Sequence, residues 1–289
     1  MSLIYVMILA VVQGLAELLP VSSSAHVVVT EKLLGLDPTS PQMTLLLVML
    51  HTGTMFAVIL YFWKQWRARY FASAEKFKRV ALLLIVATIL TGIVGEGLIK
   101  VVEHTLFRGT PHAEIENLFG RLDLIAPALA AAGVLILVAG LAAKGASGTN
   151  ASASTEVSLG QAGLIGAVQG LCLPFRGFSR SGATISVAML AGVSKVSAEA
   201  FSFALAVILT PPVIAREALR LLRAEHAAGG ASLGSAVLPS LLGALFSFLA
   251  GLLALKWLSQ WLEKGRWYLF GIYCLAAAAV VFALYRAGY

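Results

Sequence analysis

Apolar runs of about 20 residues constrain this chain more than any other feature of its sequence. A helix needs about that length to cross the hydrocarbon core of a bilayer. Five runs meet it with at most one charged residue each: Met43–Trp63, Val80–Ile99, Leu122–Ala143, Leu233–Leu255 and Trp267–Tyr285. A shorter run, Ala198–Ala215, includes Pro211 and Pro212, whose missing amide hydrogens bend or end a helix. We count this run as a sixth span.

The composition excludes an ordinary soluble domain. Hydrophobic residues make up 59% of the 289 residues and charged residues only 12%, whereas a soluble domain usually has about 25% charged residues. The formal charge of +7 comes from basic residues at the ends of the apolar runs, a pattern that sets membrane orientation. We therefore expect no nucleic-acid partner.

Two other composition-based readings are also excluded. The N-terminal apolar run lacks a basic region before it and contains Glu17, so we expect no cleaved signal peptide. Cys172 and Cys274 lie far apart in apolar sequence, which provides neither a disulfide framework nor the spacing of metal ligands. Both cysteines are expected to be packing residues.

Charge also predicts which loops face the cytoplasm. The densest basic stretch, 64–79, is expected inside because short basic loops resist translocation. The loop 100–121, which contains Glu114, then falls on the periplasmic side. The stretch 142–155 is rich in Gly, Ala, Ser and Thr and reads as a flexible cytoplasmic linker.

An internal repeat divides the chain into two similar halves. Val12-Gln13-Gly14-Leu15 recurs as Val168-Gln169-Gly170-Leu171, and each copy continues into Leu-Pro and a serine-rich turn. Three predicted spans follow each copy, and an odd number of crossings gives the halves opposite orientations. We predict a single all-α polytopic membrane domain, 1–289, with inverted repeats over 1–143 and 156–289.

Neither repeat segment reads as an ordinary spanning helix. Proline, glycine and clustered serines interrupt both, and hydrocarbon cannot satisfy the backbone groups that they free. Re-entrant helical hairpins over 3–36 and 158–193, entering from opposite sides, solve this problem. Matching interruptions in two halves indicate a binding site where the tips meet.

The first copy carries acidic and hydroxyl side chains as candidate site residues. They are Gln13, Glu17, Ser22, Ser23, Ser24 and His26. Gln13 and Glu17 share a helix face, and a carboxylate inside a membrane usually marks function. His26 follows Ser23 by three residues, a spacing that can bring the imidazole to the hydroxyl as a general base. The structural alternative is that Glu17 pairs with an arginine while the serines cap a helix.

The second copy carries cationic and small donor residues. They are Arg176, Ser179, Arg180, Ser181, Gly182 and Thr184. Arg180 presents a planar, permanently charged donor that suits phosphate oxygens, and Arg176 is expected to reinforce it. Burying arginines without anions is costly, so a ligand phosphate, Glu17 or both must compensate. His51 and Thr52 in the first span and Glu199 in the second half are candidates of lower rank.

At these motifs the sequence resembles the undecaprenyl-diphosphate phosphatase family of bacterial membrane enzymes, also known for bacitracin resistance. The residues that carry the resemblance are Gln13-Gly14-Leu15-Ala16-Glu17, Leu19-Pro20-Val21-Ser22-Ser23-Ser24-Ala25-His26 and Gly177-Phe178-Ser179-Arg180-Ser181-Gly182-Ala183-Thr184. The resemblance extends over essentially the whole chain, and two motifs in this order form a specific signal.

The resemblance implies hydrolysis of a polyprenyl diphosphate to the monophosphate, which recycles the lipid carrier of peptidoglycan synthesis. It further implies a divalent cation, Mg²⁺ or Ca²⁺, and a periplasmic active site in the bacterial inner membrane. Glu17 matches a metal ligand or acid-base group, Ser23 a nucleophile, His26 its base or acid, and Arg180 the phosphate-binding arginine. Gln13 departs from a usual glutamate, and Arg176 from a usual proline.

Two rival functions share features with this sequence. Acid-phosphatase-like lipid phosphatases share a serine-rich turn, but this sequence lacks their basic segment before the serines and their histidine after the arginine. A polyprenyl-phosphate transporter or flippase stays open, because inverted repeats with re-entrant tips are a transporter plan. A homodimer also stays open.

Overall fold

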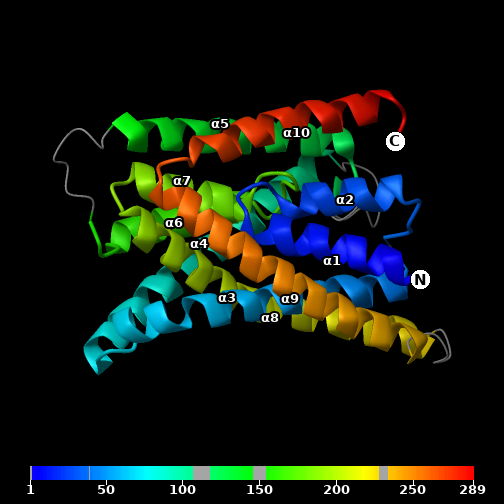
Figure 1. Ribbon diagram of the computed structural model, residues 1–289, viewed down its shortest axis with the longest axis horizontal. Coiled ribbons are helices and arrows are strands. Elements are labelled where there is room, and N and C mark those ends of the chain that lie inside the picture. The colour runs from blue at the N-terminus through cyan, green and yellow to red at the C-terminus, as the bar shows by residue number, and fades with distance from the viewer. Residues whose placement is uncertain (1, 39, 107–117, 146–153, 228–233) are drawn as a thin grey trace.

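All regular elements of the computed structural model are helices in the part of the chain that it describes, residues 2–38, 40–106, 118–145, 154–227 and 234–289. They are α1 (Leu3–Leu18), α2 (Ser23–Leu33), α3 (Pro41–Arg69), α4 (Ala74–Leu106), α5 (Leu122–Gly145), α6 (Leu159–Leu171), α7 (Arg180–Leu190), α8 (Lys195–Ala227), α9 (Gly234–Glu263) and α10 (Tyr268–Arg286). Figure 1 shows a bundle in which α5 and α10 lie side by side along the longest axis, while α9 crosses obliquely.

Six helices are long and apolar enough to cross a membrane: α3, α4, α5, α8, α9 and α10. The six predicted spans are therefore confirmed as apolar helices. Most continue beyond the apolar runs, because the basic residues at their ends extend the same helix. Leu233, Glu114 and most of the predicted linker 142–155 lie outside the described residues.

The prolines of the sixth span do not end its helix. α8 continues through Pro211 and Pro212 to Ala227. Each proline removes one backbone hydrogen bond, but inside a membrane bundle neighbouring groups tolerate that loss. Of the two effects expected at these prolines, a bend or an end of the helix, the structure excludes an end.

Two pairs of short helices occupy the predicted interrupted segments. α1 and α2 are joined by the turn 19–22, and α6 and α7 by the turn 172–179. Ser22 Oγ accepts a hydrogen bond from the Ala25 amide at 3.5 Å, and Ser179 Oγ accepts one from the Gly182 amide at 3.2 Å. Serine capping thus starts the second helix of both pairs.

The long helices hold these pairs in place through close glycine contacts. α1 packs against α9, and α6 packs against α4. A Cβ at Gly14 would lie 2.6 Å from Ser247 O, and one at Gly170 would lie 2.8 Å from Thr91 O. The glycine of each repeat copy therefore allows its short helix to approach a long helix at backbone distance. In Figure 1, α1 and α6 enter the bundle from opposite ends.

The surface of the described chain is rich in large apolar side chains. Ile93 is 63% exposed and Leu238 is 66% exposed, both on long helices. A soluble monomer rarely shows extended apolar surface. Such side chains have a favourable environment when lipid tails surround the bundle.

Packing at Gly271, where α10 meets α5, is expected to limit stability. A Cβ there would lie 2.6 Å from Leu137 N and 2.7 Å from Gly133 O. Gly271→Ala should therefore destabilise the protein by about 1–3 kcal/mol, the usual cost of overpacking, and lower its melting temperature in detergent. Gly97→Ala is the control, because no atom lies within 4 Å of its added Cβ. Equal melting temperatures for the two variants would contradict the packing.

Candidate functional site

Glu17 lies at the centre of the polar residues that the two short helix pairs bring together. It stands in the last turn of α1, and its side chain is 16% exposed. Oε1 accepts from Arg180 Nη2 at 2.6 Å, while Oε2 accepts from Ser23 Oγ at 2.5 Å and from Gln13 Nε2 at 3.2 Å. The predicted convergence of the first motif with Arg180 is therefore present in the structure.

Arg180 retains a buried donor that no described group satisfies. It is the first residue of α7, and its Nη2 bonds Glu17. Its Nη1 is buried without a hydrogen-bond partner among the described residues. An unsatisfied buried donor costs about 1–3 kcal/mol, and a guanidinium edge suits two oxygens of a phosphate. An anion is therefore the kind of partner that this donor would accept.

The small polar residues around Arg180 mostly fix its position. Ser179 caps α7 through the Gly182 amide, and Ser181 Oγ donates to Leu19 O at 3.3 Å. Thr184 Oγ1 donates to Arg180 O at 2.8 Å. Thr184 also shares a 2.6 Å hydroxyl contact with Ser202 of α8, which the sequence did not single out. The main role of these groups is therefore to hold the arginine in position.

The serine turn of the first pair has an unusual backbone. Ser22 has φ 69°, and it is the only residue other than glycine with positive φ in the described ranges. Ser22 Oγ and Ser24 Oγ lie 3.2 Å apart, and Ser24 Oγ accepts from the Gly177 amide at 3.4 Å. A hydroxyl contact thus joins this turn to the turn of the second pair. Strained backbone of this kind is usual at functional sites.

His26 does not contact Ser23 in the way that the sequence spacing suggested. Its Nδ1 lies 2.8 Å from Ser22 O, and its Nε2 lies 2.7 Å from the hydroxyl of Tyr273 on α10. Ser23 Oγ instead donates to Glu17. Glu17 is therefore the nearest proton acceptor of Ser23, and Tyr273 is a neighbour that no sequence motif indicated.

Arg176 contacts an aromatic ring and a buried acid. Its guanidinium stacks over the Phe119 ring at 4.2 Å and interacts electrostatically with Glu31 of α2. Glu31 is 3% exposed, and its Oε1 has no hydrogen-bond partner in the described part of the chain. The expectation that Arg176 reinforces Arg180 stays a prediction, and Glu31 is a buried acid that the sequence did not indicate.

Of the lower-ranked candidates, His51 approaches the site. Its Nε2 lies 3.9 Å from Glu17 Oε2, and its Nδ1 lies 2.8 Å from Leu47 O. Thr52 Oγ1 donates to Val48 O of its own helix at 2.8 Å. Glu199 accepts from Ser259 Oγ at 2.7 Å, a contact that joins α8 to α9.

The donor set suits a cation that a ligand helps to hold. No group of three or more His, Cys, Asp or Glu suited to a metal occurs among the described residues. Glu17 Oε2 and His51 Nε2 are atoms of metal-ligating types and lie 3.9 Å apart. Mg²⁺ commonly uses one or two carboxylates together with substrate phosphates. The residues therefore fit a cation shared with a phosphate group rather than a complete protein cage.

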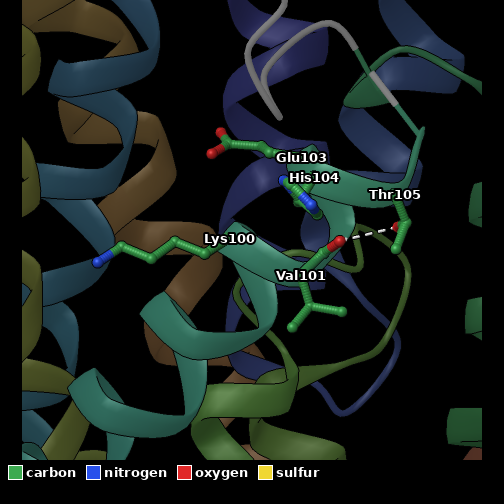
Figure 2. A pocket seen from close by; sticks show the side chains of 5 residues that line it. All are labelled: Lys100, Val101, Glu103, His104 and Thr105. Carbon is green, nitrogen blue, oxygen red and sulfur yellow. Dashed lines mark hydrogen bonds between the residues drawn. The ribbon is translucent and has the colours of Figure 1, made fainter. Parts of the chain in front are cut away.

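A surface hollow elsewhere in the structure contains none of these residues. It has a volume of about 670 Å³ at the end of α4. Figure 2 shows Lys100, Val101, Glu103, His104 and Thr105 around it, with the Thr105 hydroxyl bonded within its own helix. Because the hollow is open and lacks the converging charges, it is not the candidate site.

Known proteins resemble the chain over nearly its full length. A family described as "Bacitracin resistance protein BacA" matches residues 6–280. "Undecaprenyl-diphosphatase 2" of Acinetobacter baylyi is 58% identical over 287 residues, which cover 98% of each chain. "Undecaprenyl-diphosphatase" of Desulfatibacillum aliphaticivorans is 35% identical over 295 residues, with 96% of each chain covered. The protein of that name from Rhodopirellula baltica is 33% identical over 285 residues, with 98% of each chain covered.

Inorganic phosphate should stabilise the protein through Arg180. Binding to the folded state alone raises the melting temperature as the phosphate concentration passes the dissociation constant. Arg180→Ala should abolish this phosphate-dependent rise, although it also lowers the starting temperature by leaving Glu17 unpaired. Arg121→Ala is the matched control, since its exposed guanidinium pairs with Asp123. A rise retained in Arg180→Ala and lost in Arg121→Ala would place the anion elsewhere.

Proposed function

The chain belongs to the bacitracin resistance protein BacA family, and on this premise we propose that it hydrolyses undecaprenyl diphosphate and related polyprenyl diphosphates in the membrane. The products are the lipid monophosphate and inorganic phosphate, which returns the lipid carrier to peptidoglycan synthesis. The single observation that carries the proposal is Arg180 Nη1, which lies beside the Glu17 centre and has no hydrogen-bond partner among the described residues. A terminal phosphate has the charge and the acceptor oxygens that this donor requires.

The contacts assign a role to each central side chain. Arg180 compensates the negative charge on the phosphate oxygens, which is the main demand of phosphoryl transfer. Ser23 Oγ, which donates to Glu17 at 2.5 Å, is the proposed nucleophile, and Glu17 is positioned to accept its proton. Attack on the terminal phosphorus would break its bond to the bridging oxygen and release the lipid monophosphate, and water would then hydrolyse the phosphoserine to inorganic phosphate. His26 lies on the next helical turn and serves as a second acid-base group. Gln13 and Ser24 hold Glu17 and the neighbouring turn in place.

A divalent cation is part of the proposal. Bound Mg²⁺ or Ca²⁺ would neutralise charge on the diphosphate and polarise its oxygens. Glu17 and His51 would hold it together with the substrate. The Arg180 guanidinium already balances the Glu17 charge, so we expect the cation to bind mainly with the diphosphate.

The membrane arrangement that we propose is an inverted repeat with two re-entrant helix pairs. Support comes from the matched contacts of Gly14 with α9 and of Gly170 with α4, and from the opposite directions of α1 and α6. The first pair, 3–36, enters from the periplasm and the second, 158–193, from the cytoplasm. The site then faces the periplasm in the bacterial inner membrane, where the positive-inside rule puts residues 64–79 in the cytoplasm.

A transporter is the weaker reading. The repeat plan alone is compatible with transport, but the named relatives are diphosphatases. The contacts among Ser23, Glu17 and Arg180 also supply a nucleophile, a proton acceptor and a cationic group, as phosphoryl transfer needs.

A homodimer stays a proposal. Measurement of the molar mass of the purified protein in detergent would test it.

Purified protein should release inorganic phosphate from undecaprenyl or farnesyl diphosphate, and a chelator should suppress the release. Arg180→Ala should lower kcat by at least about 100-fold, the usual effect of removing one donor to the charge of a transition state. Arg121→Ala should stay near wild type. If wild-type protein releases no phosphate, the proposed hydrolase activity is wrong. If activity is full in the presence of chelator, only the proposed requirement for a divalent cation is wrong.

The orientation is tested by cysteine labelling in intact cells with a membrane-impermeant maleimide. Asp37 and Lys76 are exposed at opposite ends of α3. In a background with Cys172 and Cys274 replaced by alanine, Asp37→Cys should react from outside. Lys76→Cys should react only after the membrane is opened. The reverse pattern would overturn both the orientation and the periplasmic site.

A further inference from the structure

Tyr273 lies beside the serine turn of the first pair, although it belongs to neither repeat motif. Its hydroxyl is 2.7 Å from His26 Nε2, and the two rings stack with centroids 5.7 Å apart and an interplanar angle of 12°. The next residue, Cys274, donates its thiol to Pro20 O at 3.3 Å. Two successive residues of α10 therefore hold the turn that leads into α2.

The neighbours of His26 determine which ring nitrogen carries the proton. Nδ1 lies 2.8 Å from Ser22 O, and because a carbonyl oxygen only accepts, Nδ1 must donate. In the neutral imidazole Nε2 is then the acceptor, and it receives the hydroxyl proton of Tyr273. Ser22, whose carbonyl oxygen accepts from Nδ1, has a positive φ. The strained turn therefore binds one nitrogen of the ring, and Tyr273 binds the other.

The Tyr273 hydroxyl occupies the only acceptor position of the neutral ring. Any proton that reaches His26 must pass through this hydroxyl or displace it. Tyr273 is 48% exposed, and a phenol oxygen that donates its hydrogen still has lone pairs to accept another. The tyrosine therefore stands between the histidine and the space outside the bundle.

We propose that Tyr273 is a positioning residue of the phosphatase reaction, which holds His26 as the neutral imidazole protonated on Nδ1 and controls proton access to Nε2. The inference rests on the proposed function, because it concerns the acid-base group of that same site. With Tyr273, α10 contributes a side chain to the active site beside those of the two helix pairs. A packing role alone would need the ring of Tyr273 but not its hydroxyl.

Tyr273→Phe separates the two roles, because it keeps the ring and the stacking on His26 while removing the hydroxyl. It should lower kcat by at least about tenfold, part of the 10²–10⁴-fold that a positioned acid or base contributes, with KM within about twofold of wild type. Tyr285→Phe, on the same helix and 44% exposed, is the control and should retain full activity. A Tyr273→Phe enzyme with wild-type kcat would overturn the proposal.

A double-mutant cycle tests whether Tyr273 acts through His26. If it does, Tyr273→Phe should cause no further loss in a His26→Ala background, because the two changes remove one function. A full additional loss in that background would show that the tyrosine acts independently and would overturn the proposal. Monodisperse elution and a near wild-type melting temperature confirm that each variant is folded.

A spectroscopic measurement separates this inference from the proposed function. In protein labelled with ¹⁵N-histidine, the signal missing from His26→Ala identifies His26, and its Nε2 resonance should move in Tyr273→Phe but not in Tyr285→Phe. An unmoved resonance would overturn the tyrosine contact, whatever the activity. Absence of phosphate release by wild type would overturn the proposed function, while a moved resonance would leave the Tyr273 contact in place.

Discussion

The hydrogen-bonded ion pair between Glu17 and Arg180 is the interaction on which the rest of the site depends. It joins the end of α1 to the start of α7, two helices separated by more than 160 residues of sequence. Both side chains are largely withdrawn from the surface, and an unpaired charge in such a place is very costly. The two helix pairs must therefore meet for either charge to be tolerated, and the place where they meet becomes the site.

The remaining contacts restrict how the pair is held. Ser179 caps the helix that begins with Arg180, and Thr184 bonds the arginine carbonyl. On the other side, Gln13 and Ser23 share Oε2 of Glu17. One guanidinium nitrogen of Arg180 has no hydrogen-bond partner among the described residues. The frame fixes the position of the arginine charge before a ligand binds, and a charge held in this way suits an anion.

Sequence reasoning recovered what depends on local pattern. The length of an apolar run is a property of neighbouring residues, so the six spans were predictable, and the repeated Gly-containing motif pointed to the meeting of Glu17 with Arg180. Contacts set by helix rotation were not predictable. The spacing of Ser23 and His26 allowed a contact, but the turn at Ser22 directs the imidazole to Tyr273 instead. Nothing local marks Tyr273 among the apolar residues of α10.

The charges of the two helix pairs explain why their motifs differ. If both helix pairs carried a carboxylate at this place, two negative charges would repel each other in one buried site. Two arginines would repel each other in the same way. In the proposed repeat, one copy carries Glu17 and the other Arg180, so the resting site is close to neutral. The neutral Gln13 preserves that balance where a second glutamate would disturb it. A diphosphate then brings more negative charge than Arg180 alone compensates. A divalent cation that arrives with the substrate is therefore the arrangement that these charges favour.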